Sequence, residues 1–225
     1  MQAMRQAIIH TLRSYPWRHQ LLCLLPLVLL LCFLAVFIGT GHDVTLYFKA
    51  REVQHPLVTR VMRFFTNWMN FGLYLVYTAL LVFGLFRKNK GLIRFVLVFA
   101  AVQILVSSLL VHVVKIAVGR PRPSLGLEGV PYMPLSLRGG FHAFPSGHTA
   151  EISGAAFVLA NRYAQVLLSL FLGLIVALVG FSRIYFSMHH ISDVTAGLVF
   201  GVFVGLLTHH FCKPRLERDR VGVCA

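Results

Sequence analysis

Long apolar segments alternate with short polar segments along this chain. Six apolar segments stand out, at residues 21–39, 68–86, 92–114, 147–161, 164–185 and 191–211. A helix needs about 20 residues to cross the roughly 30 Å of hydrocarbon in a bilayer, at about 1.5 Å per residue. The fourth segment is shorter than this and can borrow residues from either flank. The pattern therefore predicts an all-α, polytopic membrane protein with six transmembrane helices.

The composition is also that of a protein surrounded by lipid. The chain has 225 residues, of which 57% are hydrophobic and 12% are charged, and its mean hydropathy is +0.76. No linker divides it, so we expect one integral membrane domain over residues 1–225. The first apolar segment is longer than the core of a signal peptide, and no small-x-small cleavage pattern follows it. We therefore expect it to remain as a membrane helix.

The formal charge of +14 indicates membrane topology rather than nucleic-acid binding. The basic residues are scattered between apolar segments, whereas a nucleic-acid-binding domain gathers them on one surface. Six spans place both termini on one side, and we expect that side to be the cytoplasm because cytoplasmic loops carry an excess of Lys and Arg. That side then holds 12 of the 21 basic residues, namely Arg5, Arg13, Arg18, Arg87, Lys88, Lys90, Arg94, Arg162, Lys213, Arg215, Arg218 and Arg220.

Two further segments are expected on the outer side. Residues 55–68, HPLVTRVMRFFTNW, contain a proline suited to open a helix and an apolar face, which predicts an interfacial helix on the outer leaflet. The alternative is that this segment extends the second span. Residues 119–145 are rich in proline and glycine, which predicts a structured loop.

Three short motifs place ionisable residues at the outer ends of the third to sixth predicted spans. The first is KIAVGRPRP, residues 115–123, in which Lys115, Arg120 and Arg122 surround a proline-stiffened turn. An arginine offers a planar fork that suits two phosphate oxygens, and a lysine offers a compact charge. The alternative is a basic patch that only snorkels at a helix end.

The second motif, FPSGHTAE at residues 144–151, stands directly before an apolar helix. Ser146 is suited to cap that helix, so that the amides of Gly147 and His148 point outward at a helix N-terminus, where an anion is favoured. The alternative is an ordinary cap beside an interfacial histidine. Glu151, one turn further on, either complements the helix dipole or contacts His148 or a substrate headgroup.

The third motif is FSRIYFSMHHISD, residues 181–193. His189 and Asp193 are four residues apart, so Asp193 can accept the Nδ1 proton of His189 and leave Nε2 as a nucleophile. His190 is three residues from Asp193 and can also reach it, and the spacing does not choose between the two histidines. Arg183 adds another fork for phosphate. The alternative is a His–Asp pair that only joins two helices.

Together the motifs contain a candidate for every role in phosphoryl transfer. These roles are cations for the equatorial oxygens, an in-line nucleophile and a proton donor for the leaving oxygen. The motifs resemble, in the same order, the signatures of the type 2 phosphatidic acid phosphatase superfamily. The matching patterns are K-x6-R-P at 115–123, PSGH at 145–148 and SR-x5-H-x3-D at 182–193, and the likeness covers roughly residues 50–210.

The resemblance implies a role for each matching residue. It implies that His189, oriented by Asp193, forms a phosphohistidine, and that His148 protonates the leaving group and later activates water. It also implies that no metal or other cofactor is used. Arg120 lies outside the signature positions, so we expect only a supporting role for it. The residues expected to hold the phosphate are Lys115, Arg122, Ser146, Gly147 through its amide, and Arg183.

The sequence therefore predicts an enzyme that hydrolyses a membrane lipid phosphate or diphosphate at the periplasmic face of the bacterial inner membrane. The resemblance makes undecaprenyl diphosphate, phosphatidylglycerol phosphate and phosphatidic acid candidate substrates. A lipid A phosphatase or a lipid phosphotransferase with the same motifs is the alternative. A transporter or lipid-binding protein would be expected to show inverted repeats or broken helices, which the sequence does not contain. In a metal hydrolase built on the HHISD segment, the surrounding Lys and Arg would repel the cation.

Overall fold

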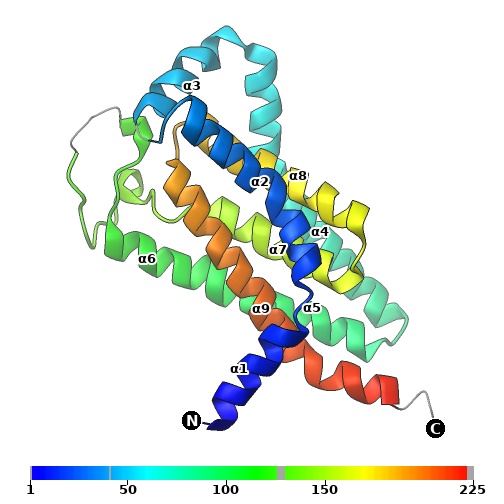
Figure 1. Ribbon diagram of the computed structural model, residues 1–225. Coiled ribbons are helices and arrows are strands. Elements are labelled where there is room, and N and C mark those ends of the chain that lie inside the picture. The colour runs from blue at the N-terminus through cyan, green and yellow to red at the C-terminus, as the bar shows by residue number, and fades with distance from the viewer. Residues whose placement is uncertain (1, 41, 126–129, 222–225) are drawn as a thin grey trace.

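The computed structural model describes residues 2–40, 42–125 and 130–221, and these form helices, turns and loops without a β-strand (Figure 1). The α-helices are α1 (Gln2–Ser14), α2 (Trp17–Phe37), α3 (His42–Gln54), α4 (Pro56–Phe86), α5 (Lys90–Gln103), α6 (Val111–Val118), α7 (Gly147–Tyr163), α8 (Val166–Tyr185) and α9 (Ile191–Val221). A π-helical segment, Ile104–Leu110, joins α5 to α6. The prediction of a helical fold is confirmed for the described residues.

Five stretches among the described residues are long and apolar enough to cross a bilayer. They are Trp17–Phe37, Pro56–Phe86, Lys90–Val118, Val166–Tyr185 and Ile191–Cys212. The fourth predicted span corresponds to α7, which has only 17 residues, and its side chains from Ile152 to Ala160 are all buried in the protein. The predicted number of six spans is therefore not confirmed.

The outer segment 55–68 does not form a separate interfacial helix. Pro56 opens α4, which continues as one 31-residue helix to Phe86. The alternative, in which the segment extends the second span, is what the structure contains. A helix that the apolar pattern did not predict, α3, precedes it, and its charged and apolar residues are too mixed to produce an apolar run.

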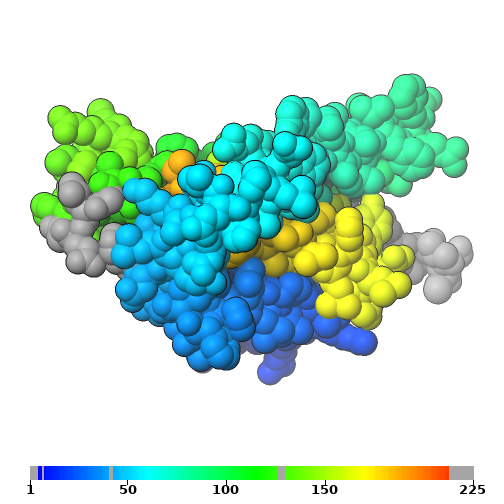
Figure 2. Space-filling model, turned by 90° about the horizontal axis from the view of Figure 1, so that it is seen from above, coloured from blue at the N-terminus to red at the C-terminus, as the bar shows by residue number. Residues whose placement is uncertain are grey.

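The helices surround α7, which passes through the middle of the bundle (Figure 1). Helix α1 and the C-terminal part of α9 lie at one end. Helix α3, the start of α4 and the loop that follows α6 lie at the opposite end. Seen from that second end, α3 and the start of α4 form much of the surface, and the beginning of α9 is visible between them and the loop (Figure 2).

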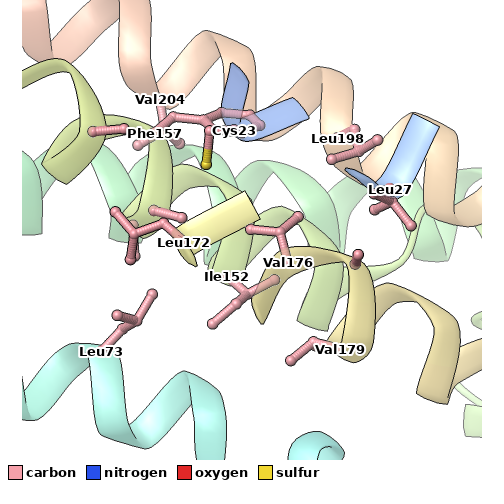
Figure 3. Packing of buried hydrophobic residues seen from close by; sticks show 14 of the residues in the cluster. Cys23, Leu27, Leu73, Ile152, Phe157, Leu172, Val176, Val179, Leu198 and Val204 are labelled. Carbon is pink, nitrogen blue, oxygen red and sulfur yellow. The ribbon is translucent and has the colours of Figure 1, made fainter. Parts of the chain in front are cut away.

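The core is formed by apolar side chains from α7 and the helices around it. Figure 3 shows Ile152 and Phe157 of α7 among side chains from α2, α4, α8 and α9. Other large apolar side chains, such as Leu29, Phe83 and Leu167, are exposed on the outside of the bundle. Such a surface fits helices that are surrounded by lipid.

Helices α7 and α9 approach each other closely through glycines. Gly197, Gly201 and Gly205 recur every four residues in α9, which is the small-xxx-small spacing of closely packed membrane helices. A Cβ atom at Gly197 would lie 2.6 Å from the carbonyl oxygen of Ser146, and one at Gly201 would collide with Ser153. The start of α7 is therefore held directly against the first half of α9.

Candidate active site

The three motifs meet at the end of the bundle where α7 and α9 begin. Hydrogen bonds join the segments that carry these motifs. These run from Lys115 Nζ to the carbonyl of His142 (3.0 Å), from the amide of Ser146 to the carbonyl of Asp193 (2.9 Å) and from Arg122 Nη1 to Met188 Sδ (3.3 Å). Residues from α6, the following loop, α7 and the α8–α9 connection thus form one cluster.

His189 is held as a neutral imidazole with its Nε2 lone pair available. Its ring is 3% exposed, and Nδ1 lies 2.6 Å from the carbonyl oxygen of Ala143. A carbonyl oxygen only accepts, so Nδ1 must carry the proton and Nε2 must carry the lone pair. Burial is the largest cause that lowers the pKa of His189 well below its usual value, and the nearby charges of Lys115 and Arg183 lower it further.

The expected hydrogen bond from His189 to Asp193 is not present. The nearest Asp193 oxygen, Oδ2, lies 3.8 Å from Nδ1, and the Ala143 carbonyl takes its place as acceptor. Asp193 is instead completely buried and accepts hydrogen bonds from Arg120 Nη1 (2.6 Å) and from the amide of His190 (2.8 Å). The carboxylate thus lies beside His189 and forms an ion pair with Arg120, although Arg120 is outside the signature positions.

Helix α7 begins at Gly147 and directs its N-terminus into the cluster. Ser146 occupies the N-cap position, as expected, but its hydroxyl makes no capping hydrogen bond and instead accepts one from Thr149 (2.9 Å). A Cβ atom at Gly147 would lie 3.6 Å from Cε of Lys115, so the lysine passes directly over the first turn. The unpaired amides of that turn and the lysine charge together favour an anion.

Three cationic side chains converge on this helix N-terminus, and two of them have buried donors without a partner. Lys115 is only 7% exposed. Arg183 donates from Nη1 to Thr66 of α4. The Nε atoms of Arg122 and Arg183 are buried, and no acceptor lies within reach among the described residues. Unsatisfied buried donors on charged groups are costly, and an oxyanion would satisfy them.

His148 follows Gly147 in the first turn of α7. Burial lowers its pKa to about 4, and the charges of Arg183, His189 and Lys115 contribute in the same direction. The imidazole is therefore neutral near pH 7 when the cluster holds no anion. A bound phosphate would counter the neighbouring cations and favour the protonated form that a general acid needs.

The structure thus brings all eight residues of the predicted site to one end of the bundle. They are Lys115, Arg122, Ser146, Gly147, His148, Arg183, His189 and Asp193. Sequence reasoning missed the carbonyl of Ala143, which carries no side-chain signal, and Thr66, which lies in a helix outside the motifs. Arg120, for which only a supporting role was expected, pairs with Asp193 at 2.6 Å.

Comparison with known proteins places this cluster in a family context. A sequence profile described as the PAP2 superfamily matches residues 92–217, which include all three motifs. A lipid A 1-phosphatase of Rhizobium johnstonii is 30% identical over 156 residues, which cover 60% of each chain. A lipid A 4'-phosphatase of Bacteroides thetaiotaomicron is 33% identical over 45% of this chain and 48% of its own. The chain spans less than two thirds of the length of these curated relatives.

A solved structure has a similar fold. The first transmembrane PAP2 type phosphatidylglycerolphosphate phosphatase from Bacillus subtilis aligns with a TM-score of 0.50 and 23% sequence identity. The alignment covers 85% of this chain and 94% of that one. The arrangement of helices around α7 is therefore shared with a known membrane protein.

Proposed function

We propose that this chain, which belongs to the PAP2 superfamily and is a multi-pass membrane protein, hydrolyses the phosphate or diphosphate of a membrane lipid. The observation that carries the proposal is the pair of buried, unpartnered guanidinium donors of Arg122 and Arg183 beside Lys115 and the N-terminus of α7. A phosphoryl group would accept hydrogen bonds from all of them. His189 Nε2 and His148 lie in the same cluster.

The proposed reaction has two steps. In the first, the Nε2 lone pair of His189 attacks phosphorus, the bond from phosphorus to the leaving oxygen breaks, and His148 gives that oxygen a proton. In the second, His148 takes a proton from water, the resulting hydroxide attacks the phosphohistidine, and inorganic phosphate leaves as His189 regains its lone pair. Lys115, Arg122 and Arg183 stabilise the charge on the transferring oxygens in both steps.

His189 becomes positively charged when it is phosphorylated, because Nδ1 keeps its proton. The carbonyl of Ala143 at 2.6 Å and the carboxylate of Asp193 at 3.8 Å both stabilise that charge. Arg120 holds Asp193 in place. Asp193 therefore acts on the histidine mainly through charge, and the carbonyl fixes the tautomer and the ring orientation.

We propose a reaction without a metal ion or other cofactor. The cations that would bind phosphate also oppose the approach of a divalent metal, and Asp193, a carboxylate of this cluster, is paired with Arg120. Lysine and arginine then perform the charge stabilisation that a metal supplies in many other phosphatases.

For the substrate, the names of the curated relatives favour a lipid A phosphate. Relatives from Rhizobium and Bacteroides are named lipid A phosphatases, whereas a 28% identical protein of Schizosaccharomyces pombe is named a probable diacylglycerol pyrophosphate phosphatase. Undecaprenyl diphosphate, phosphatidylglycerol phosphate and phosphatidic acid are the other candidates. A phosphotransferase would use the same first step and replace water with a lipid alcohol.

We further propose that the site faces the periplasm and that the termini lie in the cytoplasm of a bacterial cell. Helix α1 and the C-terminal part of α9 lie at the end of the bundle opposite to the cluster (Figure 1). The loop between α4 and α5, which contains Arg87 and Lys88, also lies away from the cluster. The positive-inside rule favours the cytoplasm for that basic end.

The experiment is phosphate release by the purified protein in detergent and excess EDTA. Lipid A phosphate, undecaprenyl diphosphate, phosphatidylglycerol phosphate and phosphatidic acid are supplied in parallel, with and without a lipid alcohol as acceptor. We expect release that survives chelation and falls by about 10⁴-fold or more in His189→Ala. Release that needs a divalent metal, or that persists in His189→Ala, would contradict the mechanism. Turnover only with the alcohol would establish a transferase.

A further inference from the structure

A cavity of about 390 Å³ lies between α4, α5, the π-helical segment and α7. Its walls are mainly apolar and include Tyr77, Leu81, Val96 and Phe99. Glu151 is the one charged side chain among the described residues that line it. This position is unexpected, because burying a carboxylate in apolar surroundings costs free energy.

Glu151 belongs to the cavity and also borders the phosphate cluster. It follows His148 by three residues, so the two side chains share one face of α7. Asn70 of α4 connects them, because its Nδ2 donates to Glu151 Oε2 (2.9 Å) and to the carbonyl of His148 (3.4 Å). Glu151 also interacts electrostatically with His112 and, more weakly, with Lys115. A lipid phosphate bound in the cluster would therefore have Glu151 at its side.

The backbone around Glu151 is fixed from two helices. Gln103 at the end of α5 donates to the carbonyl of Glu151 (2.9 Å) and to the hydroxyl of Tyr74 (3.2 Å). The π-helical segment begins directly after Gln103, and Ser107 within it donates to the carbonyl of Ala150 (3.3 Å). Segments of π-helix often occur at functional sites. These hydrogen bonds fix the position of the backbone that carries the carboxylate.

The carboxylate has more acceptor capacity than the protein uses. An ionised carboxylate offers about four acceptor positions. Asn70 is its only hydrogen-bond donor among the described residues, and no Lys or Arg lies within ion-pair distance of it there. Glu151 lines the cavity, where its remaining acceptor positions would attract a group that donates hydrogen bonds.

We propose that Glu151 forms a headgroup subsite that recognises a hydroxyl or ammonium donor on the part of the lipid attached to the phosphate. The inference rests on the proposed function and specifies its substrate class, which is a phosphorylated lipid with a donor group next to the phosphate-bearing carbon. The cluster at His148 takes the phosphate, and Glu151 selects among the lipids that carry it. A purely structural role would use Glu151 only as the acceptor for Asn70.

The test uses three synthetic monoacyl phosphates with the same chain. They carry a hydroxyl, an amino group or only hydrogen on the carbon beside the phosphate-bearing carbon. Wild-type protein is compared with Glu151→Gln, which keeps an acceptor oxygen for Asn70, and with Thr78→Val, which changes a polar side chain of the same cavity. The readout is the ratio of kcat/KM between the donor-bearing substrates and the deoxy substrate.

We expect the wild type to prefer the hydroxyl and amino substrates by about tenfold or more, because a site built for a donor rejects the analogue that lacks it. In Glu151→Gln the preference for the amino substrate falls by about tenfold, whereas Thr78→Val keeps the wild-type ratios. Equal loss on all three substrates in Glu151→Gln, or no preference in the wild type, would overturn the subsite while leaving the phosphatase intact. If His189→Ala hydrolyses the deoxy substrate as fast as the wild type, the proposed function fails and the subsite with it.

Discussion

Two buried polar clusters lie at opposite ends of α7, and they differ in charge. The cluster at its N-terminus contains Lys115, Arg122 and Arg183. The cluster at its C-terminal end is neutral: Asn161 Nδ2 donates to the hydroxyl of Tyr15 (2.6 Å) and to Gln20 Oε1 (3.3 Å), and Tyr15 in turn donates to Gln20.

The buried atoms that lack a hydrogen-bond partner also differ in charge between the two clusters. Near the N-terminus of α7 they include the Nε donors of Arg122 and Arg183, on charged groups. Near its C-terminus they are a mixture of donor and acceptors, Gln20 Nε2, Asn161 Oδ1 and Thr208 Oγ1, beside a cavity of about 340 Å³. Water can satisfy a neutral mixture of this kind, whereas buried cationic donors require an anion. We infer that the cluster at the N-terminus of α7 binds an anionic ligand and that the cluster at its C-terminal end contributes to stability.

Among the variants that distinguish the two ends of α7, Arg122→Met is expected to have the largest effect. We expect kcat/KM for a lipid phosphate to fall by about 10³-fold, because a cation on the transferring phosphoryl group is lost. Burial lowers the pKa of Arg122, so the charged form of this side chain is disfavoured in the folded protein. Because this side chain is only half-buried and solvent screens its charge, we expect no more than a small gain in stability in thermal unfolding in detergent. A variant that is both inactive and less stable would contradict the view that the Arg122 charge destabilises the folded protein.

Arg120→Ala should damage activity and stability together. It leaves the buried carboxylate of Asp193 without its ion-pair partner, which lies at 2.6 Å. Because the Arg120 side chain is 20% exposed, we expect a loss of only about 2 kcal/mol, less than for a fully buried pair, with about 10²-fold lower kcat. Adding Asp193→Asn should restore stability but not activity. If the double variant is no more stable than Arg120→Ala, the ion pair is not the cause.

Asn161→Ala tests the neutral cluster and should affect stability alone. The substitution removes two hydrogen bonds to Tyr15 and Gln20, so we expect a loss of about 1–2 kcal/mol in thermal unfolding. Activity per folded molecule should stay at the wild-type value, because the residue lies at the far end of α7 from His148. A fall in kcat for the folded fraction would show that the two ends are coupled.

The smallest effect is a change in protonation when an anion binds. The pKa of His148 is lowered to about 4 by burial and by neighbouring cations, so the free protein holds this ring neutral at pH 6. A dianion offsets the cations and raises the pKa, so binding should take up part of one proton. Sulfate suits the test because it does not titrate near pH 6.

Calorimetry of sulfate binding at pH 6, in two buffers with different ionisation enthalpies, would measure this uptake. His148→Gln is the control and should bind sulfate with a smaller proton uptake. Equal uptake in both proteins would assign the proton to another group.

The sequence predicted the uniformly apolar helices well, but it did not predict α3 or the neutral cluster. Uniformly apolar helices such as α2 and α8 were located to within a few residues, because length and hydropathy determine a span. Helix α3 was missed because its segment, HDVTLYFKAREVQ, has no apolar run. The neutral cluster was not predicted either, since Tyr15 and Asn161 belong to no motif and meet only through packing.

Within the candidate site, the motifs indicated which residues would meet but not how they would bond. The acceptor for His189 is the carbonyl of Ala143, 46 residues away, and a backbone oxygen has no sequence signal. The partner of Asp193 is Arg120, 73 residues away. Such pairings depend on the path of the loop after α6, which the residue pattern does not specify.

The close contact between α7 and α9 has a consequence for the chemistry. His148 stands on the first turn of α7, and His189 precedes the first turn of α9, so the distance between the proposed acid and the proposed nucleophile depends on how closely the two helices pack. Even a methyl group at Gly197 would lie 2.6 Å from the Ser146 carbonyl and act as a wedge between them. Because a misplacement of about 1 Å can slow a reaction about 10²-fold, we expect the rate of the proposed reaction to depend on Gly197, a residue without a side chain.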